Sequence, residues 1–152
     1  MNILLEIECD LFELNNFAKK LATKTLDIDI FLLKGELGVG KTTFARSFIN
    51  SLFDKHEVVR PVNIKSPSFP IMINYPLMSY EINHYDLYRL MNESELLEIG
   101  FFEEIEKNIS IIEWPDILLK KSILSNYYLI EFDFVDENKR IIRLQHSIKK
   151  SL

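Results

Sequence analysis

Three of the four glycines in this chain, Gly35, Gly38 and Gly40, lie within the short segment GELGVGKTTF, directly after an apolar run. Gly35 and Gly40 enclose four residues and are followed by Lys41 and Thr42, which completes the pattern G-x-x-x-x-G-K-[ST]. The apolar run predicts a strand before the pattern, and helical spacing predicts a helix after it. This is the context in which the pattern forms a phosphate-binding loop, and it disfavours a chance glycine turn.

Each part of this loop suits one part of a magnesium–nucleotide complex. Glycines let successive backbone N–H groups turn toward a phosphate, and the following helix presents its positive N-terminus. The Lys41 ammonium reaches the β- and γ-phosphates, and the Thr42 hydroxyl coordinates Mg²⁺. The predicted cofactors are ATP and Mg²⁺. The predicted nucleotide contacts are Gly35, Glu36, Leu37, Gly38, Val39, Gly40, Lys41, Thr42 and Thr43.

Hydrolysis also needs carboxylates, and two strand ends supply candidates. Glu113 ends the apolar run Ile109–Ile112, where P-loop proteins place an acidic residue that supports the metal beside the loop threonine. A surface glutamate at a strand end is the alternative interpretation. Asp86 follows His84 and Tyr85 and either positions the attacking water or caps a helix. We predict both carboxylates as catalytic and treat His84 as structural.

Two further features point to a switch or a partner contact. The segment Ser66-Pro67-Ser68-Phe69 carries two hydroxyls in a loop and could close on a γ-phosphate, or it is a proline turn that enters a strand. The chain's single tryptophan, Trp114, either stacks on a partner or anchors packing.

Periodicity predicts the elements that position these residues. Asp10 and Glu13 resemble a capping box at the start of a helix, and Asp29–Lys34 reads as the strand that feeds the phosphate loop. A strand over residues 69–75 and its return over 80–85 form a predicted hairpin, and residues 127–135 and 141–145 form a second one.

The segment between the two predicted hairpins contains a helical pattern. Residues 92–107 carry six glutamates among apolar side chains, which predicts an acidic amphipathic helix interrupted at Gly100. We therefore predict an α/β fold: one P-loop NTPase domain over residues 1–152, with a central mixed sheet flanked by helices and with antiparallel hairpins.

Composition narrows the class of protein. With 152 residues, 47% of them hydrophobic, the chain has enough apolar surface for one core. A net charge of -5 disfavours a stand-alone nucleic-acid binder, and one cysteine, Cys9, excludes an internal disulfide. Apolar runs are short and the first residues are acidic, so we expect a cytoplasmic protein without membrane association.

Taken together, four segments of the chain resemble one family, the bacterial ATPase TsaE, also called YjeE. They are GELGVGKTTFAR, SPSF, HYDLYRL and IIEWP, in that order, and the resemblance extends from about Asp10 to Arg143. It implies an ATPase that takes part in making threonylcarbamoyladenosine in transfer RNA and acts with the proteins TsaD and TsaB. The transfer RNA is then met through the complex, and the transfer itself belongs to the partners.

Residue by residue, the resemblance implies phosphate and metal contacts for Lys41 and Thr42, a metal-supporting role for Glu113 and a hydrolytic role for Asp86. It also shows departures, of which Leu14 is the largest, because many members of the family have a threonine there, near the nucleotide. The alternatives are a small-molecule P-loop kinase and a nucleotide-responsive binding subunit with negligible turnover. A GTPase is disfavoured because the chain has no Asn-Lys-x-Asp element.

Overall fold

The computed structural model describes residues 1–147, so residues 148–152 of the predicted domain lie outside the described part. The strands are β1 (Asn2–Cys9), β2 (Ile30–Gly35), β3 (Met72–Pro76), β4 (Glu81–Asp86), β5 (Ile109–Glu113), β6 (Tyr127–Phe134) and β7 (Arg140–Ser147). The helices are α1 (Leu11–Thr23), α2 (Lys41–Lys55), α3 (Ser94–Glu98), α4 (Phe101–Glu104) and α5 (Asp116–Lys120). Within residues 1–147, none of these helices has the length and apolar character needed to cross a membrane.

The strands form one mixed sheet in the order β1-β7-β6-β2-β5-β4-β3. The four inner strands β6, β2, β5 and β4 run parallel, whereas β3 pairs antiparallel with β4 and β7 pairs antiparallel with both β6 and β1. This arrangement confirms the predicted α/β fold and both hairpins. The strand that feeds the phosphate loop, β2, lies at the centre, between β6 and β5.

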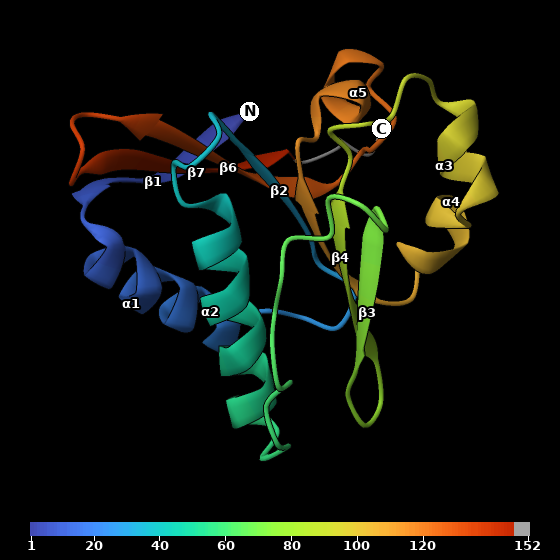
Figure 1. Ribbon diagram of the computed structural model, residues 1–152, viewed down its shortest axis with the longest axis horizontal. Helices are drawn as coiled ribbons and strands as arrows, with labels where there is room; N and C mark the ends of the chain where they lie inside the picture. Colours follow the sequence, from blue (N-terminus) through green and yellow to red (C-terminus); the bar gives the residue numbers. More distant parts are fainter. Residues whose placement is uncertain (148–152) are drawn as a thin grey trace.

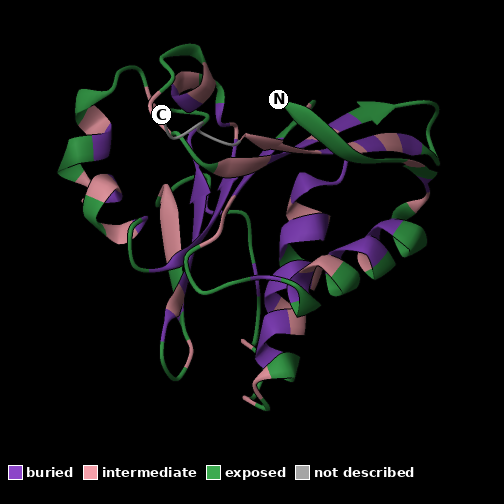
Figure 2. Cartoon of the chain, turned by 180° about the vertical axis from the view of Figure 1, so that it is seen from behind, coloured by how far each residue is buried: buried purple, intermediate pink, exposed green. Residues whose placement is uncertain are grey.

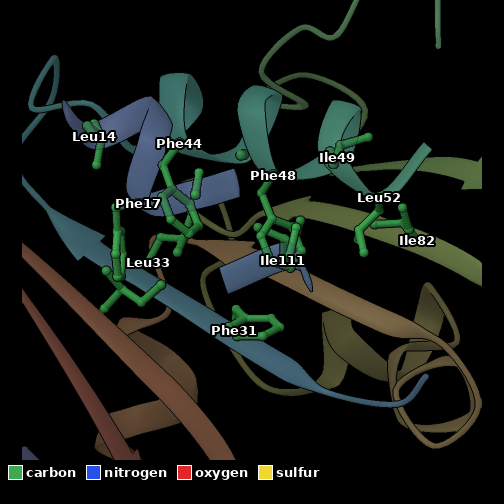
Figure 3. Close-up of a cluster of buried hydrophobic side chains, with 14 of the residues drawn as sticks. Leu14, Phe17, Phe31, Leu33, Phe44, Phe48, Ile49, Leu52, Ile82 and Ile111 are labelled. Atoms are coloured by element: carbon green, nitrogen blue, oxygen red, sulfur yellow. The ribbon is translucent and has the colours of Figure 1, made fainter. Parts of the chain in front are cut away.

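Helices cover both faces of this sheet, and alternation along β2 divides the core between them. Phe31 and Leu33 point to a large cluster under α1 and α2, whereas Leu32 points to a second cluster under α3, α4 and α5 (Figure 1). The buried residues follow the inner strands and the sheet-facing side of α2 (Figure 2). Phe31 packs against Phe48 of α2 in a tilted arrangement with 5.0 Å between ring centroids, which fixes the helix behind the phosphate loop (Figure 3).

Local signals mark the start of α1 and the break in the acidic helix as predicted, although the acidic segment is helical only over α3 and α4 and not over all of residues 92–107. At the start of α1, the Asp10 side chain accepts a hydrogen bond from the Glu13 N–H, and the Glu13 side chain accepts one from the Asp10 N–H, which confirms the capping box. The acidic helix is interrupted at Gly100, which adopts a left-handed conformation with φ of 70° between α3 and α4.

One boundary was wrong. We predicted that the first hairpin strand includes Phe69, but β3 begins at Met72 and the Phe69 side chain is 80% exposed. Pro70 lacks an N–H, and the Ile71 N–H donates to the carbonyl of Pro67, which closes a turn. Ile71 has a φ of 70°, so the chain reverses sharply before the strand starts.

The strand register determines where the acidic residues lie. Leu33 of β2 is paired with Glu113 of β5, and Glu113 is paired with Asp86 of β4. These three parallel strands therefore end at the same edge of the sheet, beside the N-terminus of α2. Ligands of open α/β sheets bind at this carboxyl edge.

Candidate functional site

A cavity of about 410 Å³ opens at the carboxyl edge of the inner strands. Its wall comes from five segments of the chain: Leu11 of α1, the phosphate loop with the start of α2, the loop residues Ser66 and Ser68, Asp86 and Tyr88 at and after the end of β4, and Glu113 with Trp114 at the end of β5. The fold thus brings the phosphate loop, both predicted carboxylates, the two serines and the tryptophan to one cavity.

The conformation of the phosphate loop depends on its glycines. Gly38 and Gly40 have φ of 78° and 123°, in the region where side chains cause strain. Gly35 is required for packing, because a Cβ there would lie 2.8 Å from the carbonyl oxygen of Phe132 in β6. The helix α2 begins after Gly40 without a capping side chain, so its first N–H groups remain available to an anion.

Lys41 lies at the floor of the cavity and is only 5% exposed. Its ammonium donates hydrogen bonds to the carbonyls of Gly35 and Glu36, and it sits 3.4 Å from the centre of the Trp114 ring. Burial lowers the pKa of the Lys41 ammonium, and the carboxylates of Glu113 and Asp86 oppose this shift. Because burial disfavours the charged form of this amine, an anion that enters the cavity would stabilise the ammonium.

Glu113 joins two elements through its two oxygens. The Thr42 hydroxyl donates to Glu113 Oε1 at 2.9 Å, and His84 Nε2 lies 2.6 Å from Glu113 Oε2. The Glu113 and His84 side chains are 2% and 0% exposed, so Glu113 is not a surface glutamate at a strand end. His84 thus contacts the predicted metal-supporting residue, a role that the sequence reasoning did not assign to it.

Asp86 is 4% exposed and holds the turn that follows β4. Its Oδ1 accepts the N–H of Tyr88 at 3.0 Å, and its Oδ2 accepts the hydroxyl of Ser66 at 3.3 Å. The next residues form a turn, so Asp86 does not cap a helix. Its carboxylate borders the cavity and is linked directly to the predicted switch segment.

The aromatic residues around the cavity form two contacts. Tyr88 packs against Trp114 with ring centroids 4.8 Å apart, and the Arg89 guanidinium lies 5.5 Å from the centre of the Phe69 ring. Trp114 therefore anchors packing and at the same time forms part of the cavity wall. Phe69 projects to solvent just outside it.

Three of the predicted nucleotide contacts do not line the cavity: Gly35, Glu36 and Val39. Val39 is buried, and its side chain packs in the core. Leu14, the departure from the family pattern, is also fully buried, whereas Leu11 of the same helix lines the cavity.

The oxygens beside the loop fit a magnesium ion. The Thr42 hydroxyl and the Glu113 carboxylate are hard oxygen donors 2.9 Å apart, next to the helix N-terminus that would receive the phosphates. Magnesium in nucleotide sites keeps several waters and takes only one or two protein oxygens together with phosphate oxygens. A set of two protein ligands open to a cavity therefore fits this ion.

Comparisons with known proteins agree with the family resemblance. A family model described as "Threonylcarbamoyl adenosine biosynthesis protein TsaE" matches residues 10–142. A Rickettsia felis protein is 39% identical over 129 residues, covering 85% of this chain and 72% of its own length. A Rickettsia typhi protein is 38% identical over 138 residues, covering 91% and 89%.

A more distant relative also matches over most of its length. This Aquifex aeolicus protein is 29% identical over 142 residues, and the match covers 93% of this chain and 93% of the relative. All three relatives carry the name tRNA threonylcarbamoyladenosine biosynthesis protein TsaE. The crystal structure of Bacillus subtilis YdiB shares the fold, with a TM-score of 0.70 and 20% identity over 97% of this chain and 88% of that one. This chain belongs to the TsaE family.

Proposed function

We propose that the protein binds ATP with Mg²⁺ and hydrolyses it, as the ATPase of the machinery that makes threonylcarbamoyladenosine in transfer RNA. The observation that carries the proposal is the meeting of Lys41, the Thr42–Glu113 pair and Asp86 around one cavity at the N-terminus of α2. The names of the relatives support the pathway, and the resemblance described above supports TsaD and TsaB as partners.

Each side chain has a defined task in this proposal. The loop N–H groups and the start of α2 bind phosphate oxygens, and the Lys41 ammonium exchanges its bonds to backbone carbonyls for bonds to the β- and γ-phosphates. A magnesium ion bound by Thr42 and supported by Glu113 would neutralise charge on the β- and γ-oxygens.

Asp86 orients the attacking water. The water oxygen forms a bond to the γ-phosphorus while the bond to the β,γ-bridging oxygen breaks, which yields ADP and phosphate. The Asp86 carboxylate borders the cavity and accepts a hydrogen bond from the water, and Ser66 fixes the carboxylate. Asp86 thereby links water positioning to the segment Ser66–Phe69.

Glu113→Gln should raise the Mg²⁺ concentration that supports half-maximal ADP binding about tenfold, because a neutral amide supports the ion less well than a carboxylate. The substituted side chain can still accept the Thr42 hydroxyl, so the fold should persist. The measurement is a titration of ADP affinity against Mg²⁺.

Glu131→Gln is the matched control, because Glu131 lies in β6 and bonds to Gln145 outside this cavity. An unchanged Mg²⁺ requirement in Glu113→Gln would remove Glu113 from the metal site.

Partner contact should involve two aromatic residues at the cavity, the exposed Phe69 beside it and the half-buried Trp114 in its wall. Phe69→Ala and Trp114→Ala should each weaken binding to TsaD and TsaB about tenfold, because large aromatic side chains dominate interface energies. Met78→Ala is the control: Met78 is 87% exposed but lies in the β3–β4 turn, at the opposite end of the sheet. If all three variants bind the partners like the wild type, the docking surface lies elsewhere.

A further inference from the structure

One buried cation beneath the phosphate loop has no role in the function described so far. Arg140 is the first residue of β7 and is only 3% exposed. Its Nε donates a hydrogen bond of 3.1 Å to the carbonyl oxygen of Val39, and its Nη1 donates one of 3.3 Å to the carbonyl oxygen of Asn138. Among residues 1–147, no carboxylate pairs with it.

Burial of a guanidinium without a carboxylate partner is costly, and an apolar residue at this strand position would avoid the cost. Arg140 also lies far from the phosphate loop in sequence, so its contact with Val39 forms only when β7 has joined the sheet. A buried cation at this place is therefore best explained by its effect on the loop.

The explanation follows from the geometry of the peptide bond between Val39 and Gly40. The bond is trans, like all those described, and in a planar trans peptide the carbonyl and the N–H point in opposite directions. Arg140 holds the Val39 carbonyl, so the N–H of Gly40 faces away from Arg140. Gly40 borders the nucleotide cavity, whereas Arg140 is not part of the cavity wall.

Without this hydrogen bond the peptide would be free to turn. Gly40 has a φ of 123° and, as a glycine, tolerates many other backbone conformations, so rotation of the 39–40 peptide costs little there. The rotated form would present a carbonyl oxygen, which repels phosphate, in place of an N–H donor. Preorganised N–H groups are what make such a loop an anion site.

We propose that Arg140 is a positioning residue for nucleotide binding: it fixes the Val39–Gly40 peptide so that the Gly40 N–H points toward the phosphates. The proposal rests on the proposed nucleotide site and adds a residue that does not touch the nucleotide. In this role, the hydrogen-bond donor of Arg140 matters more than its charge.

Two substitutions separate donor from charge. In glutamine, the side-chain amide nitrogen lies as many bonds from the backbone as the arginine Nε, so Arg140→Gln keeps a donor without the charge. Arg140→Met has a similar reach and no donor. We expect Arg140→Met to weaken Mg–ADP binding about tenfold and Arg140→Gln to weaken it less than about threefold.

Fluorescence of the single tryptophan, Trp114, reports ADP binding because it lies in the cavity wall. Arg143→Met is the matched control on the same strand, because Arg143 forms surface ion pairs with Glu6 and Asp133. Melting temperatures of all variants are measured in parallel. If Arg140 served folding alone, its substitution would lower the melting temperature, but Arg140→Met would not bind Mg–ADP more weakly than Arg140→Gln.

Amide NMR of the full-length wild type provides a test that needs no variant. The Gly40 N–H signal should shift strongly on addition of Mg–ADP, together with those of Lys41 and Thr42. Equal affinities for the Met and Gln variants, or a Gly40 signal that stays in place while the Lys41 signal moves, would overturn the role of Arg140. Failure of the wild type to bind ADP would instead refute the nucleotide site itself.

Discussion

Lys41→Ala is expected to weaken ATP binding on the order of 100-fold, because hydrogen bonds between charged groups contribute about 1.5–3 kcal/mol each and this ammonium bonds to two phosphates in the proposed complex. Lys41 is buried at the floor of the cavity, held by two carbonyls and the Trp114 ring. Calorimetric titration with Mg–ATP measures the loss without relying on the fluorescence of the neighbouring tryptophan.

Lys34→Ala is the matched control for this substitution. Lys34 lies in β2 and is exposed, outside the nucleotide cavity. It should bind ATP like the wild type. Wild-type affinity in a folded Lys41→Ala variant would show that the loop does not bind the nucleotide in the way described.

Asp86→Asn is expected to separate binding from turnover. The amide oxygen of asparagine can still accept the N–H of Tyr88, so the turn after β4 should persist and ATP affinity should stay within about threefold of the wild type. Hydrolysis in the complex with TsaD and TsaB should fall about 100- to 1000-fold, because a neutral amide replaces the charged acceptor that orients the attacking water. Single-turnover phosphate release measures this step.

The control for Asp86 is Asp116→Asn. Asp116 at the start of α5 is close enough to oppose, with Glu113 and Asp86, the lowering of the Lys41 pKa by burial, but it is exposed and outside the cavity wall. It should retain turnover. If Asp86→Asn hydrolyses ATP at the wild-type rate in the complex, another group orients the water.

The parts of the site that the sequence predicts are those encoded by neighbouring residues. The phosphate loop, the capping box at Asp10 and the interruption at Gly100 depend on spacings of a few residues, and the structure shows a loop, a cap and a break at these places. Hairpins are also local, since a turn and two alternating runs suffice to predict them.

The contacts that sequence reasoning missed depend on register between distant strands. His84 meets Glu113 only because β4 and β5 are parallel neighbours in a register that pairs Asp86 with Glu113. Arg140 meets Val39 only because β7 folds back beside β6 at the far side of the phosphate loop. His84 lies two residues before Asp86, the predicted catalytic aspartate, and this spacing was the signal available for the first contact, since both side chains face the same side of a strand.

The error at Phe69 has a local cause that alternation could not reveal. Spaced apolar residues from Phe69 to Tyr75 look like one strand, but the turn closed by Ile71 places Phe69 outside the sheet. That turn exposes Phe69 beside the cavity and leaves it available to a partner.

If this site hydrolyses ATP as part of a complex, steady-state ATP hydrolysis by the purified protein must depend on the partners. The assay compares the wild type alone, with TsaD and TsaB, and with both proteins and transfer RNA, with Lys41→Ala as the inactive reference. We predict little turnover by the protein alone and strong activation by the partners. Full activity without partners, or no activity above the Lys41→Ala reference in the complete mixture, would rule out a partner-activated ATPase.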